Sequence, residues 1–390
     1  MKESAVLKPV FVKESKKDID LILSIKESDW DFSNDNVRDG THSIHPYPAK
    51  FIPNIPRNLI KFLYQVPDTY VLDPFCGCGT TLVECMYAQI PSVGIDLHPL
   101  ATLITKVKTS PVASSLIPFS NDIISKCKNS KYDIPDIPNL DHWFQPSVQE
   151  ALAGLTVEIN KVHDSSVRDA LKVALSSIIV RVSNQDSDTR YAAVQKDVSA
   201  DQVYKQFENA VALIDGKLGE VLKGAVNGCS PVKIINKDVL KVEPHELPKN
   251  ISLVITSPPY PNAYEYWLYH KYRMYWLGMD PIEVKNSEIG ARPHYFKKNH
   301  QTEADFEMQM ERCFWLFSEV MIKRGKVCFL VGSSVIHGRT IDNVEILIRA
   351  GAKHGFKLLT TVCRSIPDTR KTFNPKNGRI NQETLVVFSL

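Results

Sequence analysis

The sequence Thr-Ser-Pro-Pro-Tyr at 256–260 directly follows an apolar run, Ile251–Ile255. An apolar run of this length predicts a buried strand, so the polar residue, the prolines and the aromatic ring would lie at the carboxyl edge of a sheet. Because proline restricts the backbone, the carbonyl groups and the ring have little freedom to move. Such an arrangement suits the binding of a flat polar ring.

A second chemical motif lies upstream, where the apolar segment Tyr70–Leu72 leads into a glycine turn at 73–81 and a helical stretch follows. Glycine lets a ligand approach the backbone closely, and the start of the next helix favours polar or anionic groups. A second predicted strand, Ser92–Ile95, ends in Asp96. An acid about twenty residues after the glycine turn is well placed to bind ribose hydroxyls. The two segments together predict a nucleoside-bearing cofactor.

Three motifs occur in the order DPFCGCGTT at 73–81, GIDLHP at 94–99 and TSPPY at 256–260. They resemble the cofactor and catalytic motifs of S-adenosylmethionine-dependent amino-methyltransferases acting on DNA, and the serine before the prolines is most similar to cytosine-N4 enzymes. HPYPAKF at 45–51 resembles the segment that closes over the methionine end of the cofactor in that family. The resemblance covers roughly 44–105 and 232–390. It implies an α/β, Rossmann-like class I methyltransferase fold with a seven-stranded mixed sheet in a three-layer sandwich.

The resemblance also implies the cofactor, S-adenosyl-L-methionine, and the residues that hold it. Asp96 is expected at the ribose, and Asp238, after the predicted strand Val232–Asn236, at the adenine amine. The alternative for Asp238 is an aspartate in a surface loop. The expected cofactor-binding residues are Tyr47, Lys50, Phe51, Asp73, Pro74, Phe75, Cys76, Gly77, Gly79, Thr80, Thr81, Asp96, Leu97, Asp238 and Ser257.

The exocyclic amine of cytosine is a poor nucleophile because its lone pair is delocalised into the ring. Acceptors placed at its N–H groups would draw that lone pair out as the transition state forms. The Ser257 hydroxyl and the Pro258 carbonyl are the candidate acceptors. Pro259 would restrict the backbone and Tyr260 would stack on the base, and these four residues, 257–260, are called the base seat below. Since this amine is paired and stacked in a duplex, we expect the base to be flipped out. No Pro-Cys dipeptide occurs in the sequence, which disfavours cytosine-C5 chemistry.

The pattern along the chain predicts four segments: a polar leader at 1–40 with a short strand in Val6–Val12, a cofactor-binding half at 41–108, a mainly helical insertion at 109–230, and a catalytic half at 231–390. The insertion is too long for a loop in a compact domain. Its position is similar to that of the target-recognition segment in some methyltransferases. Within it, Arg181–Tyr191 is a polar stretch in which Arg181 and Arg190 are candidate DNA contacts, with a solvated loop as the alternative.

Two further basic segments could bind nucleic acid or could equally be solvated loops. Gly290–His300 combines aromatic residues with the candidates Arg292, Lys297 and Lys298. The segment between the last two predicted strands is a plausible phosphate contact through Arg364, Arg370, Lys371, Lys376 and Arg379.

Composition places few limits on function. The net charge of +3 is mildly basic, so a nucleic-acid footprint would have to come from local clusters. Eight cysteines without a disulfide framework, and no apolar amino-terminal segment, predict a cytoplasmic protein, and no run is apolar enough for a membrane span. Neither the cysteines nor the histidines show zinc-site spacing, so no metal is expected. The expected partner is double-stranded DNA. The resemblance also implies a companion restriction endonuclease as an optional partner, since both paired and solitary enzymes of this kind exist.

Three alternatives to cytosine-N4 methylation remain open from the sequence. Adenine-N6 methylation of DNA would use the same fold and seat. A tRNA guanine-N2 methyltransferase has a similar glycine motif, but Ser257 and the short leader disfavour it. The third alternative is a DNA-binding relative without catalysis, against which the motif residues are all present.

Overall fold

In the computed structural model, which describes residues 16–33, 35, 39–110, 112, 114–188, 190–224, 230–261, 264–296, 300–366 and 382–390, seven strands form one mixed sheet. Their order is β10-β11-β7-β6-β1-β2-β5, and β11 alone runs antiparallel to its neighbours. The strands are β1 Tyr70–Asp73, β2 Ser92–Asp96, β5 Val232–Asn236, β6 Ile251–Thr256, β7 Met321–Gly332, β10 Lys357–Ser365 and β11 Gln382–Ser389. The predicted class I methyltransferase fold with a seven-stranded mixed sheet is confirmed.

Helices cover both faces of this sheet, as a parallel sheet requires. Successive strand residues face opposite sides, so Leu72 packs with α14 and α15 while Val71 packs with α1, α2 and α3. These two apolar layers explain why the central strands read as continuous apolar runs. The helices are α1 Lys16–Glu27, α2 Asn54–Leu63, α3 Thr80–Tyr87, α4 Pro99–Thr109, α14 Glu303–Val320 and α15 Asn343–Ala352, with short 3₁₀ turns at Gly40–Ser43, Val239–Lys241 and Pro244–Glu246.

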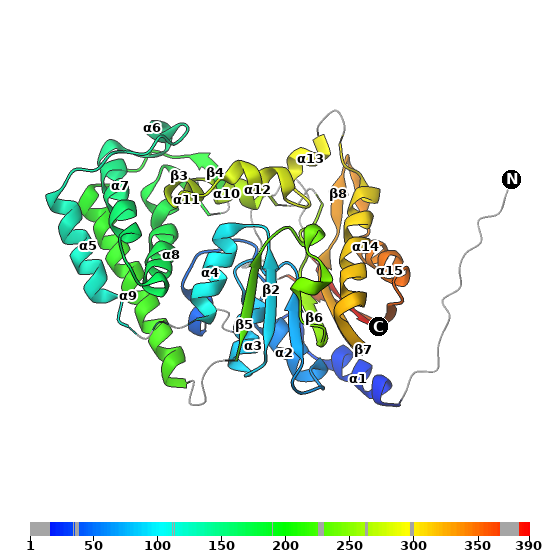
Figure 1. Cartoon of the computed structure of the whole chain (residues 1–390). Coiled ribbons are helices and arrows are strands. Elements are labelled where there is room, and N and C mark those ends of the chain that lie inside the picture. Colours follow the sequence, from blue (N-terminus) through cyan, green and yellow to red (C-terminus); the bar gives the residue numbers. More distant parts are fainter. Residues whose placement is uncertain are drawn as a thin grey trace.

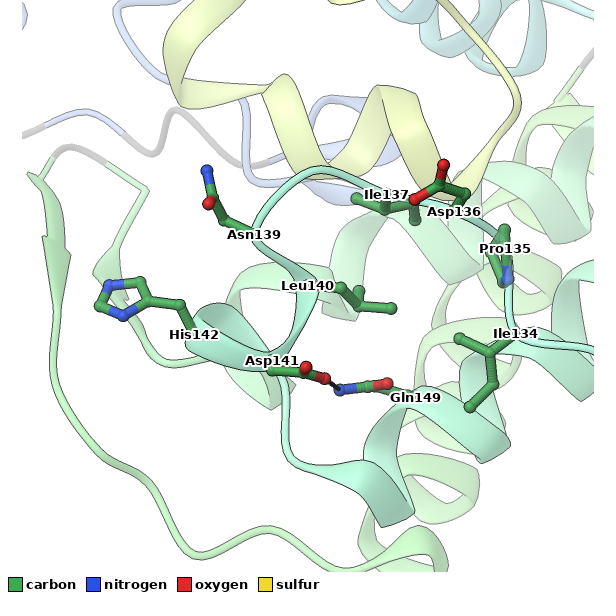
Figure 2. Close-up of a pocket in the computed structure, with 9 residues that line it drawn as sticks. All are labelled: Ile134, Pro135, Asp136, Ile137, Asn139, Leu140, Asp141, His142 and Gln149. Atoms are coloured by element: carbon green, nitrogen blue, oxygen red, sulfur yellow. Dashed lines mark hydrogen bonds between the residues drawn. The ribbon is translucent and has the colours of Figure 1, made fainter.

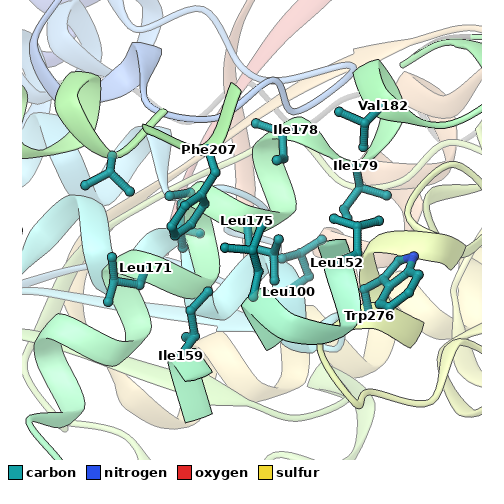
Figure 3. Close-up of a cluster of buried hydrophobic side chains, with 14 of the residues drawn as sticks. Leu100, Leu152, Ile159, Leu171, Leu175, Ile178, Ile179, Val182, Phe207 and Trp276 are labelled. Carbon is teal, nitrogen blue, oxygen red and sulfur yellow. The ribbon is translucent and has the colours of Figure 1, made fainter. Parts of the chain in front are cut away.

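The segment at 109–230 is mainly helical and stands beside β5 and α4 at one end of the sheet (Figure 1). It contains α5 Ile117–Asn129, α6 Leu140–Trp143, α7 Pro146–Asn160, α8 Ser165–Val182, α9 Ala200–Gly224 and a hairpin of β3 Gln185–Ser187 with β4 Arg190–Ala193. Its apolar core is not self-contained. Figure 3 shows Leu152, Leu171 and Phe207 of the insertion packed with Leu100 of α4 and with Trp276, the last residue of α11 Lys271–Trp276.

Short helices and a second hairpin follow the carboxyl ends of β6 and β7 (Figure 1). They are α10 Tyr266–Tyr269, α11 Lys271–Trp276, α12 Pro281–Ser287 and α13 Arg292–Phe296, and the hairpin of β8 Ser334–Ile336 with β9 Arg339–Ile341. Three aromatic residues of this region, Trp267, Tyr272 and Trp276, are buried in the core. No helix in the described part of the chain is long and apolar enough to cross a membrane.

Local details differ from the sequence prediction in two places. The polar stretch Arg181–Tyr191 includes the end of α8, at Val182, and most of a β-hairpin that runs from Gln185 to Ala193. The segment Gly290–His300, expected to be a loop, contains the short helix α13. The strand expected in the leader lies outside the described residues.

Candidate active site

The glycine turn after β1 has the backbone geometry that only glycine adopts without strain. Gly77 and Gly79 have φ values of +49° and +81°. A Cβ at Gly79 would lie 2.6 Å from Thr105 Cγ2, so a larger residue would collide with α4. The Cys76 amide donates to the Ile95 carbonyl at 2.9 Å, which ties the turn to the end of β2.

Asp96 completes this turn from the neighbouring strand. Its two carboxylate oxygens accept the Gly77 and His98 amides, each at 2.8 Å. Burial raises the pKa of Asp96 to about 6, although both amide hydrogen bonds lower it. The side chain remains partly exposed, and each oxygen keeps a further lone pair for a hydroxyl donor.

Tyr47 lies directly against the glycine turn. A Cβ built on Gly77 would be 3.8 Å from Tyr47 Cε1, and the Tyr47 ring stacks on His270 with centroids 4.7 Å apart. Lys50 Nζ donates to the His42 carbonyl at 3.1 Å, and Phe51 packs against the apolar layer of α2. Tyr47 therefore faces the turn, while Lys50 and Phe51 hold the segment that presents it.

Asp73 joins the glycine turn to the Ser-Pro-Pro-Tyr strand. It is 2% exposed, and its Oδ1 accepts the Thr256 hydroxyl at 2.7 Å and the Phe75 amide at 3.2 Å. Burial raises the pKa of Asp73 to about 6. Several other predicted cofactor residues are also buried around the turn: Pro74, Cys76, Thr80 and Thr81.

Asp238 stands at the carboxyl end of β5, next to β2 in the sheet. Its Oδ1 caps the following turn by accepting the Leu240 amide at 3.0 Å. The side chain of Asn236, two residues earlier, donates to the carbonyls of Asp96 and Leu97 at 3.0 and 2.9 Å. The expected adenine and ribose residues thus share one edge, and the role of Asp238 stays a prediction.

A polar network missed by the sequence analysis fixes the Tyr260 ring. The Tyr260 hydroxyl donates to Glu383 Oε1 at 3.1 Å and lies 3.3 Å from the Leu330 carbonyl and 3.4 Å from Ser257 Oγ. Arg364 Nη1 binds Glu383 Oε2 at 2.7 Å. The prediction of Arg364 as a phosphate contact is wrong, because its side chain is buried between Glu383 and the Trp30 carbonyl.

Glu288 is a second functional candidate that the sequence did not suggest. Its carboxyl group accepts the Tyr266 and Trp267 amides at 2.8 and 3.1 Å, and so caps α10 just after the seat. Burial raises the pKa of Glu288 to about 8. Nearby, Gly290 has a φ of +77°, and a Cβ there would lie 2.6 Å from the Tyr260 carbonyl. The chain can therefore pass this close to the seat only with glycine.

The insertion reaches the same region through its hairpin. Arg273 of α11 is 1% exposed and pairs with the Asp188 carboxylate, while the Tyr264 hydroxyl lies 3.4 Å from the Asp188 carbonyl. Two residues away, Arg190 is exposed, with Asp186 3.7 Å from its guanidinium. Arg181 and Arg292 are also exposed. The other DNA-contact candidates lie outside the described residues: Lys297, Lys298, Arg370, Lys371, Lys376 and Arg379.

An open hollow of about 670 Å³ lies elsewhere, within the insertion (Figure 2). Ile134, Asn139, His142 and Gln149 are among its lining residues, and no predicted site residue is. Within the described ranges, no group of three or more His, Cys, Asp or Glu side chains could hold a metal ion.

Residues 9–106 match the N6/N4 methyltransferase family described as DNA methylase. The chain is 30% identical over 252 residues to the type II methyltransferase M.MvaI of Kocuria varians, a match that covers 59% of this chain and 55% of that protein. It is 37% identical over 114 residues to the type II methyltransferase M.MjaII of Methanocaldococcus jannaschii, covering 28% and 21%. The resemblance to amino-methyltransferases is confirmed, and the family supports S-adenosylmethionine as the cofactor. The chain spans about half the length of M.MvaI.

Solved structures show only a distant likeness. TrmN from Thermus thermophilus matches with a TM-score of 0.34 and 10% identity over 87% of this chain and 49% of that chain. The rRNA methyltransferase AviRa from Streptomyces viridochromogenes matches with a TM-score of 0.31 and 12% identity over 89% and 87%. Likenesses of this size say nothing about substrate.

Proposed function

We propose that this chain is an S-adenosylmethionine-dependent DNA methyltransferase that acts on the exocyclic N4 amine of cytosine. The observation that carries the proposal is the hydrogen bond between Thr256 and Asp73, 2.7 Å long, which joins the ends of two adjacent parallel strands. It supports a base-binding role for residues 257–260, which follow Thr256 directly and so lie close to the glycine turn. A flat base and a nucleoside cofactor would therefore meet at one sheet edge.

The residues of the turn fit the nucleoside part of the cofactor. Glycines with positive φ leave the backbone open to a ligand, Asp96 offers carboxylate acceptors to ribose hydroxyls, and Tyr47 flanks the turn with an aromatic face. When bound, the cofactor supplies an electrophilic methyl group on a sulfonium. The remaining chemistry, which is the activation and orientation of the amine, falls to the protein.

Ser257 and Pro258 perform that activation in our proposal. Their oxygens accept the two amine N–H groups, which draws the lone pair out of the ring as positive charge develops on nitrogen. The nitrogen then releases one of these protons to solvent, which restores a neutral amine. Tyr260 stacks on the base and holds the amine in line with the methyl group. Because the target amine is paired and stacked within a duplex, the target base must leave the helix, at a cost of a few kcal/mol.

The hairpin of the insertion is the proposed contact for DNA next to the seat. Arg190 is 69% exposed in its side chain and stands two residues from Asp188, which Arg273 and Tyr264 bind. We expect Arg190→Ala to weaken duplex affinity about tenfold, since a charged contact to phosphate contributes about 1.5 kcal/mol. Cofactor affinity, measured by calorimetry, should not change. Equal duplex affinity of wild type and variant in a fluorescence anisotropy titration would refute this contact.

Adenine-N6 methylation is the second candidate, because the same acceptors could hold an adenine amine and the matched family includes both activities. The relatives named as type II methyltransferases support action on DNA in a restriction-modification system, with a companion endonuclease as a possible partner. RNA guanine-N2 methylation and a non-catalytic role have less support. Neither explains the intact Ser257–Tyr260 seat together with the DNA methylase match.

The deciding experiment incubates the purified chain with methyl-labelled S-adenosylmethionine and unmodified genomic DNA. The DNA is then digested, and its nucleosides are separated by mass spectrometry. Labelled N4-methylcytosine is the expected product, whereas N6-methyladenine would keep the mechanism and change the base. If labelled cofactor binds but neither product forms, the proposal fails.

A further inference from the structure

An exposed aromatic and basic patch lies where α13 meets the β8–β9 hairpin. It consists of Arg292, Phe296, His300, His337 and Arg339, and is called the α13 patch below. The Phe296 and His337 ring centroids are 5.7 Å apart, and those of His300 and His337 are 4.5 Å apart. The Arg292 guanidinium lies 5.4 Å from the Phe296 ring centre. Along the chain, α14 and β7 separate the two segments that these contacts join. In space, α13 and β8 lie side by side (Figure 1).

Phe296 is exposed to an unusual degree for a large apolar side chain. It is 56% exposed, and only Met308 on α14, at 59%, is more exposed among the large apolar residues of the described chain. A single exposed phenylalanine needs no explanation by itself. Here, however, it is grouped with two imidazoles and two guanidinium groups, which are the side chains that stack on bases and bind phosphates.

The hairpin that carries His337 is tightly built. His337 and Gly338 have φ values of +49° and +77°, the signature of a two-residue turn that suits the twist of a hairpin. In this hairpin, Ser334 pairs with Ile341 at the open end and Ile336 pairs with Arg339 next to the turn. Ile336 and Ile341 are buried in the sheet core, so the turn is anchored while His337 and Arg339 remain exposed. The aromatic group is therefore presented on a fixed support.

Both segments of the patch begin at the base seat. The Leu330 carbonyl of β7 lies 3.3 Å from the Tyr260 hydroxyl, and β7 ends at Gly332, just before the hairpin. On the other side, Gly290 packs against the Tyr260 carbonyl, and α13 starts two residues later. Tyr260 is thus contacted by the two segments that continue outward into the patch. A duplex that delivers a base to Tyr260 would pass beside it.

We propose that the α13 patch binds duplex DNA next to the flipped base, with Phe296 and His337 packing against exposed base faces and Arg292 and Arg339 binding phosphates. This inference rests on the proposed function. When the target base leaves the helix, the bases beside it lose a stacking partner, and Phe296 and His337 would replace that lost stacking. The arginines would add a sequence-independent contribution that falls with salt.

The test compares patch variants with matched controls elsewhere on the surface. Phe296→Ala is paired with Met308→Ala, which removes an equally exposed apolar side chain from α14. Arg339→Ala is paired with Lys249→Ala, since Lys249 is exposed and precedes β6, at the opposite edge of the sheet. Each protein is titrated with a random-sequence duplex oligonucleotide at several salt concentrations, and separately with S-adenosylmethionine. Methyl transfer to unmodified genomic DNA gives kcat and the KM for DNA.

Arg339→Ala should weaken duplex binding several-fold and reduce the salt slope by about one, as for the loss of one phosphate contact. Phe296→Ala should raise the KM for DNA about tenfold, the effect of losing one stacking contact. Both should leave the cofactor Kd unchanged, and both controls should behave as wild type. Patch variants that match their controls in duplex affinity, salt slope and KM would overturn the inference.

The same experiment separates this inference from the proposed function. If wild type transfers methyl groups and the patch variants bind DNA as well as their controls, the proposed function stands and the DNA-binding role of the α13 patch is refuted. If the patch variants alone lose duplex binding and even wild type transfers no methyl group, the α13 patch stands as a DNA-binding surface and the proposed function is refuted.

Discussion

Tyr260→Phe is the substitution that isolates the hydroxyl network at the base seat. It keeps the ring that we expect to stack on the base and removes the oxygen that binds Glu383 at 3.1 Å. Glu383 keeps its 2.7 Å ion pair with Arg364, so the change leaves no buried charge without a partner. The variant should fold, and its defect should report the orientation of the ring.

The size of the effect follows from these contacts. A hydrogen bond to a charged group contributes about 1.5–3 kcal/mol. All three contacts of the hydroxyl, at 3.1, 3.3 and 3.4 Å, are longer than the ~2.7–2.8 Å typical of hydroxyl donors, so the lower end applies. A loss of about 1.5 kcal/mol in the transition state corresponds to a roughly tenfold lower kcat. The cofactor Kd should not change, because Asp96 and Gly77 are untouched.

Steady-state methyl transfer to genomic DNA measures kcat, and a calorimetric titration measures the cofactor Kd. Tyr64→Phe is the matched control, since Tyr64 is also half-buried and donates its hydroxyl to a backbone carbonyl, that of Thr69, at 3.0 Å. It lies before β1, away from the carboxyl edge. Tyr260→Phe with the kcat of wild type, or a control with an equal loss, would refute the positioning role.

Three further predictions follow from the turn and the cap of α10. Asp96→Ala should weaken cofactor binding at least tenfold in calorimetry, because it removes a ribose acceptor and the carboxylate bound to the glycine turn; an unchanged Kd would refute the ribose role. Gly79→Ala should lower the melting temperature in calorimetric scans, since its Cβ would lie 2.6 Å from Thr105; an unchanged melting temperature would show that α4 can accommodate the methyl group. Burial raises the pKa of Glu288 to about 8 from 4.5, so the folded state favours the protonated acid and stability should fall as pH rises. We expect a loss of ~2–3 kcal/mol between about pH 6 and 9, which Glu288→Gln should abolish in urea titrations; an equal loss in the variant would show that another group titrates.

Much of the fold was predictable because its signals are local. Buried parallel strands read as apolar runs such as Ile251–Ile255, and each run was followed by a motif that only a sheet edge could position. The hairpin at 185–193 was not predicted, because its strands are short and polar and gain stability from contacts with α10 and α8. Tertiary contacts of this kind leave no periodic pattern in the sequence.

The motif residues of the candidate site were predictable from the sequence, but the residues that hold them in place were not. Arg364 read as part of a basic surface cluster, because sequence order does not tell which side chains of an edge strand point inward. Pairing the last two strands as a hairpin would have helped, since Arg364 lies directly opposite Glu383 in the observed register. Nothing in the sequence linked Glu288 to α10 or Tyr47 to His270, because these pairs meet only after the insertion and α10–α12 pack over the sheet edge.

The insertion and the catalytic edge are joined by a buried charge as well as by a shared core. Arg273 is 1% exposed, and its Nε donates to the Ser176 carbonyl of α8 at 3.0 Å while its Nη2 pairs with Asp188 of the hairpin. Moving the hairpin tip away from α11 would leave the buried Arg273 guanidinium without its carboxylate partner, which is destabilising. Met274 and Trp276 of the same helix lie in the insertion core. The proposed DNA contact at Arg190 of the hairpin would therefore be held at a fixed distance from the proposed base seat.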